Sequence, residues 1–242
     1  MPKKTAKQYS FDYRHHHFKV ILDKVLIFRL LHRLHGRFWG VAAALGFSAG
    51  LTVCFLIRPD LFTPSAAISD FSMDVRTAPY FAGSIFFAAY GLWRWRKYLK
   101  RTLRRTRPIL GLITLTIIGL CIVALTPNGW RIWPSRIHLI GMTLVGISAA
   151  ATVVFDILLS KTPLNQNTPR IKLVKMACFL LIVVGGWLTM GSSHWLEWFQ
   201  VALPSELMLM GGYLMWVILK THQGEDPRSG LSRLLKRVIL ID

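Results

Sequence analysis

The chain has 242 residues, of which 30 are Lys or Arg and 11 are Asp or Glu, giving a formal net charge of +19. Hydrophobic residues make up 53% of it and charged residues only 17%, which excludes a disordered chain and disfavours a soluble α/β enzyme. Several stretches of 17 or more residues carry no charge, which also argues against a nucleic-acid-binding protein. The combination indicates a polytopic membrane protein with basic connecting segments.

The first element expected along the chain is an amphipathic helix at 18–35. Apolar residues recur there at helical spacing, with Lys, Arg and His largely between them, so the helix is suited to the cytoplasmic headgroup layer. A helix docked against the underside of the bundle is the alternative. The first 37 residues lack the apolar core and cleavage site of a signal peptide, so the first span is expected to act as an uncleaved insertion signal.

Six long runs of apolar residues follow. About 20 such residues cross the hydrocarbon core as a helix, because every backbone N–H and C=O must be bonded inside the segment. The predicted spans are 38–57, 77–93, 109–126, 137–159, 176–193 and 201–219. The expected fold is all-α, a six-transmembrane-helix bundle at 38–219 between basic segments at 1–37 and 220–242.

The distribution of Lys and Arg predicts the orientation. Of the 30 cations, 26 lie in the two terminal segments and in the connections 94–108 and 160–175, and four lie in the other three connections. Because cytoplasmic connections carry the excess of Lys and Arg, both termini are expected in the cytoplasm. Short outer connections and the lack of a targeting signal favour a bacterial inner membrane.

The connection after the second span predicts a lipid-binding surface. It holds eight cations and no acid. They are Arg94, Arg96, Lys97, Lys100, Arg101, Arg104, Arg105 and Arg107. Such a cluster beside a span attracts anionic lipid at the cytoplasmic face, and it also acts as a topology determinant. Nucleic acid is not expected as a partner, because no recognised binding motif surrounds these cations.

Tryptophan and glycine positions predict how the helices meet lipid and one another. Seven tryptophans, including Trp39 and Trp95, lie near span ends and predict an aromatic belt, whereas Trp187 and Trp216 are expected to be packing residues. The Gly46 to Gly50 spacing of the first span predicts close helix packing.

Two acidic residues lie inside spans, where ionisable groups are costly. Asp156, near the cytoplasmic end of the fourth span, is expected to form an ion pair with Lys161 or with a cation of a neighbouring loop. Glu206 follows Pro204 at the start of the sixth span, near the positive end of that helix. It is either a helix-terminal carboxylate or part of an outward-facing polar site.

Several acidic and histidine residues are expected on the outer face: Asp70, Asp74, His138, His194, Glu197 and Glu206. Carboxylates with histidines can bind a divalent ion or transfer protons. Their spacing matches no zinc, Ser/His/Asp or di-iron signature, so no catalytic residue, metal site or cofactor is assigned.

Three short motifs accompany the six-span layout: Ala67-Ile-Ser-Asp70, Ile137-His-Leu-Ile-Gly141, and Ser205-Glu-Leu207 at the start of a span that runs through Tyr213 to Lys220-Thr221. In these motifs and this layout the chain resembles the Frag/DRAM/Sfk-type family and related prokaryotic six-span families of unknown function. Leu207 stands where the eukaryotic family usually has Trp after the acidic residue. The resemblance implies a membrane protein without established catalysis, in a group tied to lipid-anchor remodelling or autophagy, and it makes Asp70, His138 and Glu206 the candidate site residues.

The expected function is that of a non-enzymatic integral membrane protein that binds or senses lipid, or serves as an accessory subunit of a membrane-protein partner. One alternative is a membrane-embedded lipid-modifying enzyme that uses an outward-facing Asp/His/Glu site. A small-solute transporter is the other, which the uninterrupted apolar spans disfavour.

Overall fold

The structure is a computed structural model that describes residues 36, 38–102, 107–127, 132–159, 169–194 and 201–223. In these residues all regular structure is helical. The chain divides into two compact units, Met1–His35 and Gly36–Asp242, and the described residues belong to the second. The amphipathic helix expected at 18–35 lies outside the described residues.

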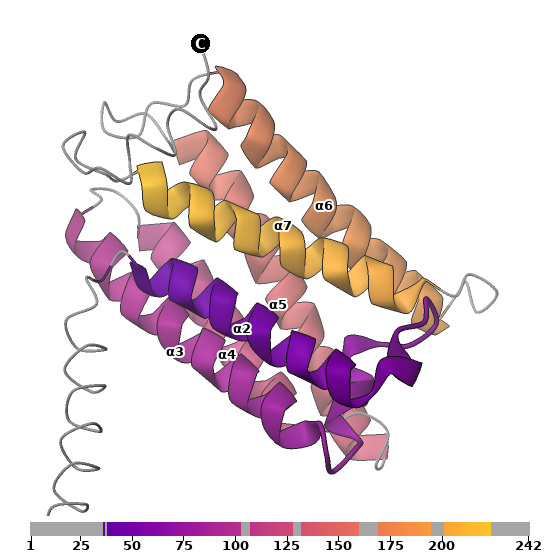
Figure 1. Ribbon diagram of the computed structural model, residues 1–242. Helices are drawn as coiled ribbons and strands as arrows, with labels where there is room; N and C mark the ends of the chain where they lie inside the picture. Colours follow the sequence, from indigo (N-terminus) through magenta and orange to yellow (C-terminus); the bar gives the residue numbers. More distant parts are fainter. Residues whose placement is uncertain are drawn as a thin grey trace, which may run out of the picture. The chain divides into compact units, whose positions relative to one another are not determined.

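Six long helices form the described part of the chain (Figure 1). They are α2 (Phe38–Ile57), α3 (Ala78–Thr102), α4 (Arg107–Leu125), α5 (Ile132–Leu159), α6 (Pro169–His194) and α7 (Ala202–Gln223). All of them except α3 are long and apolar enough to cross a membrane. The all-α membrane fold is therefore confirmed, with five of the six expected spans meeting this criterion, while the second span remains a prediction.

Helix α3 continues well past the end of the predicted second span. Residues 94–102 belong to this helix rather than to a connecting loop. Leu, Arg and Lys are strong helix formers, and neither Gly nor Pro interrupts the segment before Pro108, which lies in the first turn of α4 where proline is tolerated. The basic residues at 94–101 and Arg107 are consequently held on helix ends.

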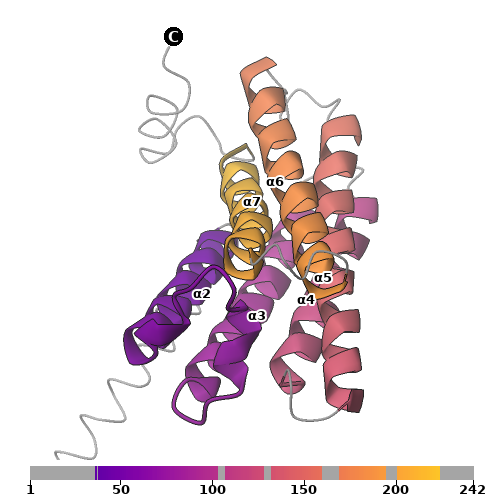
Figure 2. The ribbon, with the colours of Figure 1, turned by 90° about the vertical axis from the view of Figure 1, so that its right-hand side faces the viewer.

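The helices pack in chain order and form a ring. Each packs against the next one in the sequence, and α7 also packs against α2 (Figure 2). Two short 3-10 helices, η1 (Pro59–Leu61) and η2 (Ile68–Ser72), lie between α2 and α3. The end of the bundle that holds them is here named the η end. The opposite end, where α3 and α7 finish and α2 and α4 begin, is named the basic end.

Glycines allow these close approaches. A methyl group at Gly46 or Gly50 of α2 would collide with Phe87 or Ser84 of α3. A methyl group at Gly185 of α6 would lie 2.5 Å from the backbone oxygen of Ser205 in α7. The close packing predicted from the small residues of the first span is thus confirmed.

Three of the tryptophans do not lie as the sequence suggested, whereas Trp216 is buried as expected. Trp39 and Trp95 are 2% and 0% exposed, so the expectation of an aromatic belt is wrong for these two residues. Trp95 packs edge-to-face against Trp216 of α7, with ring centroids 5.7 Å apart, at the basic end where α7 returns to α2. Trp187 is 62% exposed, so the expectation that it packs against other helices is wrong for the described residues.

Candidate functional site

The cations expected to bind lipid headgroups lie at the basic end, in the last turns of α3 and at the start of α4. Lys97, Lys100, Arg101 and Arg107 are exposed there, and Arg94 and Arg96 are half-buried. Arg104 and Arg105 lie outside the described residues. The described cations lie at the end of α3 and at the start of α4, so their charges add at the basic end.

The two half-buried arginines are held by aromatic and backbone groups. The guanidinium of Arg94 lies 5.2 Å from the centre of the Trp39 ring and donates a hydrogen bond of 3.1 Å to the Tyr90 hydroxyl. Arg96 donates from Nε to the backbone oxygen of Leu110 over 2.9 Å, which ties α3 to α4. These contacts fix where the basic segment lies.

A fully buried ion cluster also lies toward the basic end. Asp156 of α5 pairs with Lys175 of α6 at 2.6 Å and with Lys220 of α7 at 2.5 Å. Trp216 donates a further hydrogen bond of 3.1 Å from Nε1 to Asp156. The expectation of an ion pair at Asp156 is confirmed, with partners inside two helices, whereas Lys161 lies outside the described residues.

This cluster has a clear structural consequence. It joins three helices through side chains of which none is more than 1% exposed. A carboxylate removed from water needs cationic and hydrogen-bond partners to remain charged, and Asp156 has both kinds. The sequence signal was two lysines inside or at the end of apolar runs, but their common partner is set by the packing.

Asp70 and Glu206 meet at the η end. The carboxylate of Asp70 accepts a hydrogen bond of 2.8 Å from the backbone N–H of Ala67. Glu206, only 5% exposed, accepts one of 2.6 Å from the adjacent N–H of Ile68. The two carboxylates therefore bind successive amides at the start of η2, and Glu206 joins this short helix to α7.

His138 lies at the start of α5 and is bound to the end of α4. Its Nδ1 is 2.5 Å from the backbone oxygen of Thr126, and since a carbonyl only accepts, Nδ1 is the donor. Nε2 is buried and has no hydrogen-bond partner among the described residues. Of the three candidate residues, Asp70 and Glu206 are thus joined through hydrogen bonds to the start of η2, whereas His138 binds Thr126, the residue that follows α4.

An ion network at the same end was not anticipated. Arg58, one residue after α2, pairs with Asp60 at 2.5 Å and with Asp74, and Arg76 pairs with Asp74 at 3.0 Å. The Arg76 side chain and backbone N–H, together with Arg58, hold the pKa of Asp74 well below its usual range. The i, i+2 spacing of opposite charges in 58–60 and 74–76 was the available sequence signal.

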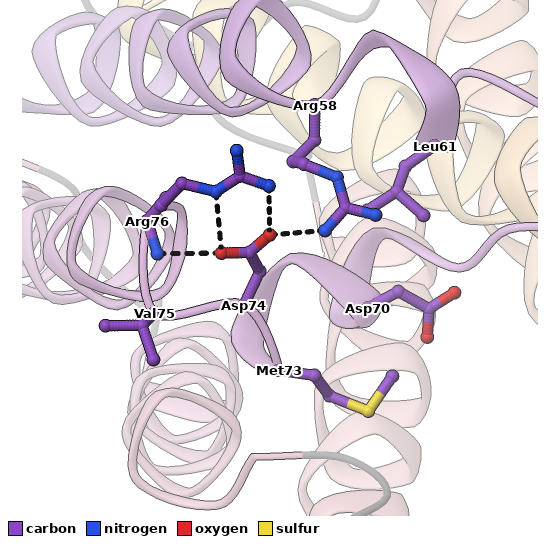
Figure 3. A pocket seen from close by; sticks show the side chains of 7 residues that line it. All are labelled: Arg58, Leu61, Asp70, Met73, Asp74, Val75 and Arg76. Atoms are coloured by element: carbon purple, nitrogen blue, oxygen red, sulfur yellow. Dashed lines mark hydrogen bonds and ion pairs between the residues drawn. The ribbon is translucent and has the colours of Figure 1, made fainter.

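This network borders an open cavity of about 700 Å³. Figure 3 shows the side chains that line it: Arg58, Leu61, Asp70, Met73, Asp74, Val75 and Arg76. All of them come from the connection between α2 and α3. The cavity therefore lies at the η end, immediately beyond the end of a spanning helix.

No group of three or more His, Cys, Asp or Glu side chains within the described ranges is placed to hold a metal ion. The side chains of His194 and Glu197 lie outside what the structure describes. The whole chain matches no family model, no curated protein and no solved structure. The chain is an all-α protein with apolar helices typical of an integral membrane protein.

Proposed function

We propose that this integral membrane protein is not an enzyme and that its basic end binds the headgroups of anionic lipids. The proposal rests on the exposed cations of α3 and α4, which have no acidic residue near them in the sequence. No Asp or Glu occurs anywhere in residues 77–155. A phosphate of a lipid headgroup would thus meet several cations and no repelling carboxylate from this part of the chain.

The surroundings of these cations support binding at a membrane surface. Trp93 is 39% exposed, and Arg96 and Lys97 lie over its ring at 5.4 and 5.3 Å. Tryptophan favours the headgroup level of a bilayer, where its ring is partly in lipid and partly in water. Long basic side chains reach from such a position to the phosphates.

The charge distribution supports an orientation with the basic end in the cytoplasm of a bacterial inner membrane. Anionic lipids give the cytoplasmic leaflet a negative surface potential, worth about 1 kcal/mol for each nearby cation. The resemblance to the Frag/DRAM/Sfk-type family agrees with a lipid-related role and likewise remains a proposal. The carboxylates of Asp70 and Glu206 both bind backbone amides of η2, which favours a structural role over catalysis.

Lipid binding can be measured by native mass spectrometry of protein purified from nanodiscs of phosphatidylcholine with increasing phosphatidylglycerol. Lys100→Gln and Arg101→Gln should each weaken phosphatidylglycerol binding about fivefold, and the double variant should weaken it about 25-fold, as expected for the loss of ~1 kcal/mol per cation. Arg136→Gln is the matched control, since Arg136 is exposed at the η end. Unchanged phosphatidylglycerol binding by the double variant would contradict the proposal.

A further inference from the structure

The cavity at the η end contains four charged side chains, and two of them, Arg58 and Asp74, have a hydrogen bond at every side-chain nitrogen or oxygen. Arg58 uses all three guanidinium nitrogens: Nε and Nη2 donate to Asp60, and Nη1 donates to Asp74. Each oxygen of Asp74 accepts two hydrogen bonds. Oδ2 accepts from Nη1 of Arg58 and Nη2 of Arg76, and Oδ1 accepts from the backbone N–H and Nε of Arg76. Arg58 and Asp74 therefore form the structural centre of the network.

Arg76 and Asp70 retain capacity for a ligand. Arg76 donates from Nε and Nη2 to Asp74, at 3.3 and 3.0 Å, and its Nη1 has no partner among the described residues. Asp70 accepts from Ala67 at one oxygen, and its other oxygen has no partner in the same part of the chain. In Figure 3, Arg76 and Asp70 lie on opposite sides of Asp74.

One open cation and one open anion on the same cavity match a ligand that carries both charges. We propose that the cavity binds a zwitterion with a primary ammonium and a phosphate, the chemistry of a phosphoethanolamine group. The ammonium donates to Asp70, and the phosphate accepts from the free edge of Arg76. Charge-assisted hydrogen bonds of this kind are the strong ones, so two of them at opposite ends of the ligand fix its direction.

The position of the cavity favours phosphate as the anionic part. Arg58 directly follows the last residue of α2, so the cavity lies at the level where a spanning helix leaves the hydrocarbon and meets lipid phosphates. Met73 and Val75 on its rim are 41% and 83% exposed, which gives the acyl part of a lipid an apolar surface. A headgroup in the cavity can thus remain attached to a lipid in the bilayer.

The lining also discriminates between ammonium types. A primary ammonium has three N–H donors, whereas a quaternary ammonium has none and is held by aromatic rings instead. The apolar lining residues are Leu61, Met73 and Val75, and none of them is aromatic. Phosphoethanolamine should therefore bind in preference to phosphocholine.

The test uses full-length protein in phosphatidylcholine nanodiscs doped with phosphatidylethanolamine, with bound lipid counted by native mass spectrometry. Wild type should enrich phosphatidylethanolamine over phosphatidylcholine. Asp70→Asn and Arg76→Gln should each weaken that binding about tenfold, as the loss of one charge-assisted hydrogen bond predicts. Asn keeps an oxygen for the Ala67 amide, so folding is preserved in the Asp70→Asn variant. Asp60→Asn is the control, because it removes a charge from the same network at a residue that does not line the cavity.

Equal binding of the two lipids by wild type, or an unchanged preference in Asp70→Asn, would overturn the proposal. Added soluble phosphoethanolamine distinguishes the sources of the ligand: displacement of the lipid shows that the free zwitterion suffices, and retention of the lipid shows that the attached chains are needed. The result is independent of the basic end, because Lys100→Gln with Arg101→Gln should change phosphatidylglycerol binding and leave the phosphatidylethanolamine preference intact.

Discussion

Asp156 of α5 and Lys220 of α7 form an ion pair of 2.5 Å in which neither side chain is more than 1% exposed. Lys175 of α6 approaches the other carboxylate oxygen at 2.6 Å. One carboxylate thus connects three helices in the interior of the bundle. Breaking a buried ion pair by removing one partner costs about 3–5 kcal/mol, because the remaining charge loses its compensation.

Asp156→Leu is therefore expected to lower the free energy of unfolding by about 3–5 kcal/mol, since both ammonium groups lose the Asp156 carboxylate. Unfolding in mixed micelles, followed by circular dichroism, measures this change. The triple variant Asp156→Leu, Lys175→Met, Lys220→Met removes all three charges and should recover much of the loss. A triple variant that is less stable than the single one would contradict a dominant charge effect.

Glu206 attaches η2 to α7 through the N–H of Ile68. Glu206→Leu should lower stability by about 1–3 kcal/mol, because it leaves a backbone donor without its acceptor. Glu206→Gln keeps an acceptor oxygen and should have a much smaller effect. Hydrogen–deuterium exchange of residues 64–72 is the readout: exchange should increase in the Leu variant alone, and equal protection in both variants would show that the contact does not hold η2.

Gly185 provides the closest backbone approach between α6 and α7. An added methyl group would meet backbone atoms of Ser205 and Leu209 at 2.5 and 2.6 Å, so the helices must separate. Gly185→Ala should therefore lower stability by about 1–3 kcal/mol. Gly111→Ala is the control, since a methyl group there meets no atom within 4 Å and alanine favours the helix. Equal melting temperatures for the two variants would contradict the packing described.

The network at Asp74 predicts an acid-dependent contribution to stability. Arg76 and Arg58 lower the pKa of Asp74 in the folded state, so its contribution is complete above its unfolded pKa of about 4 and is lost as the pH falls toward the lowered value. The melting-temperature difference between wild type and Asp74→Asn should thus be constant from about pH 8 to pH 5 and shrink below about pH 4. A difference that grows with acid would contradict this sign.

The helices themselves follow from local properties of the sequence. Runs of about 20 apolar residues predict spans because the backbone must bond within each segment. Four of the five apolar helices lie within three residues of the predicted ranges, whereas α6 begins at Pro169, seven residues before the predicted fifth span. Residues 94–102 and 169–175 are exceptions, because their local charge was interpreted as a connecting loop although Arg and Lys are good helix formers.

The polar contacts depend on packing between distant segments and were only partly predictable. Asp156 was expected to need a cation, but hydropathy does not show that Lys220 of another helix faces it. Glu206 was expected near a helix end, and its partner Ile68 belongs to a 3-10 helix that no pattern predicted. Trp39 and Trp95 were expected in an aromatic belt but are buried, because position near a span end does not determine which side of a helix is buried.

We propose that the η end and the basic end lie on opposite sides of a membrane, with the basic end in the cytoplasm. Cysteines introduced as Val75→Cys and Arg101→Cys test it, since both positions are exposed in the structure. A membrane-impermeant maleimide applied to intact cells should label Val75→Cys at once and Arg101→Cys only after the membrane is permeabilised. Labelling of both variants in intact cells, or of Arg101→Cys alone, would contradict the account.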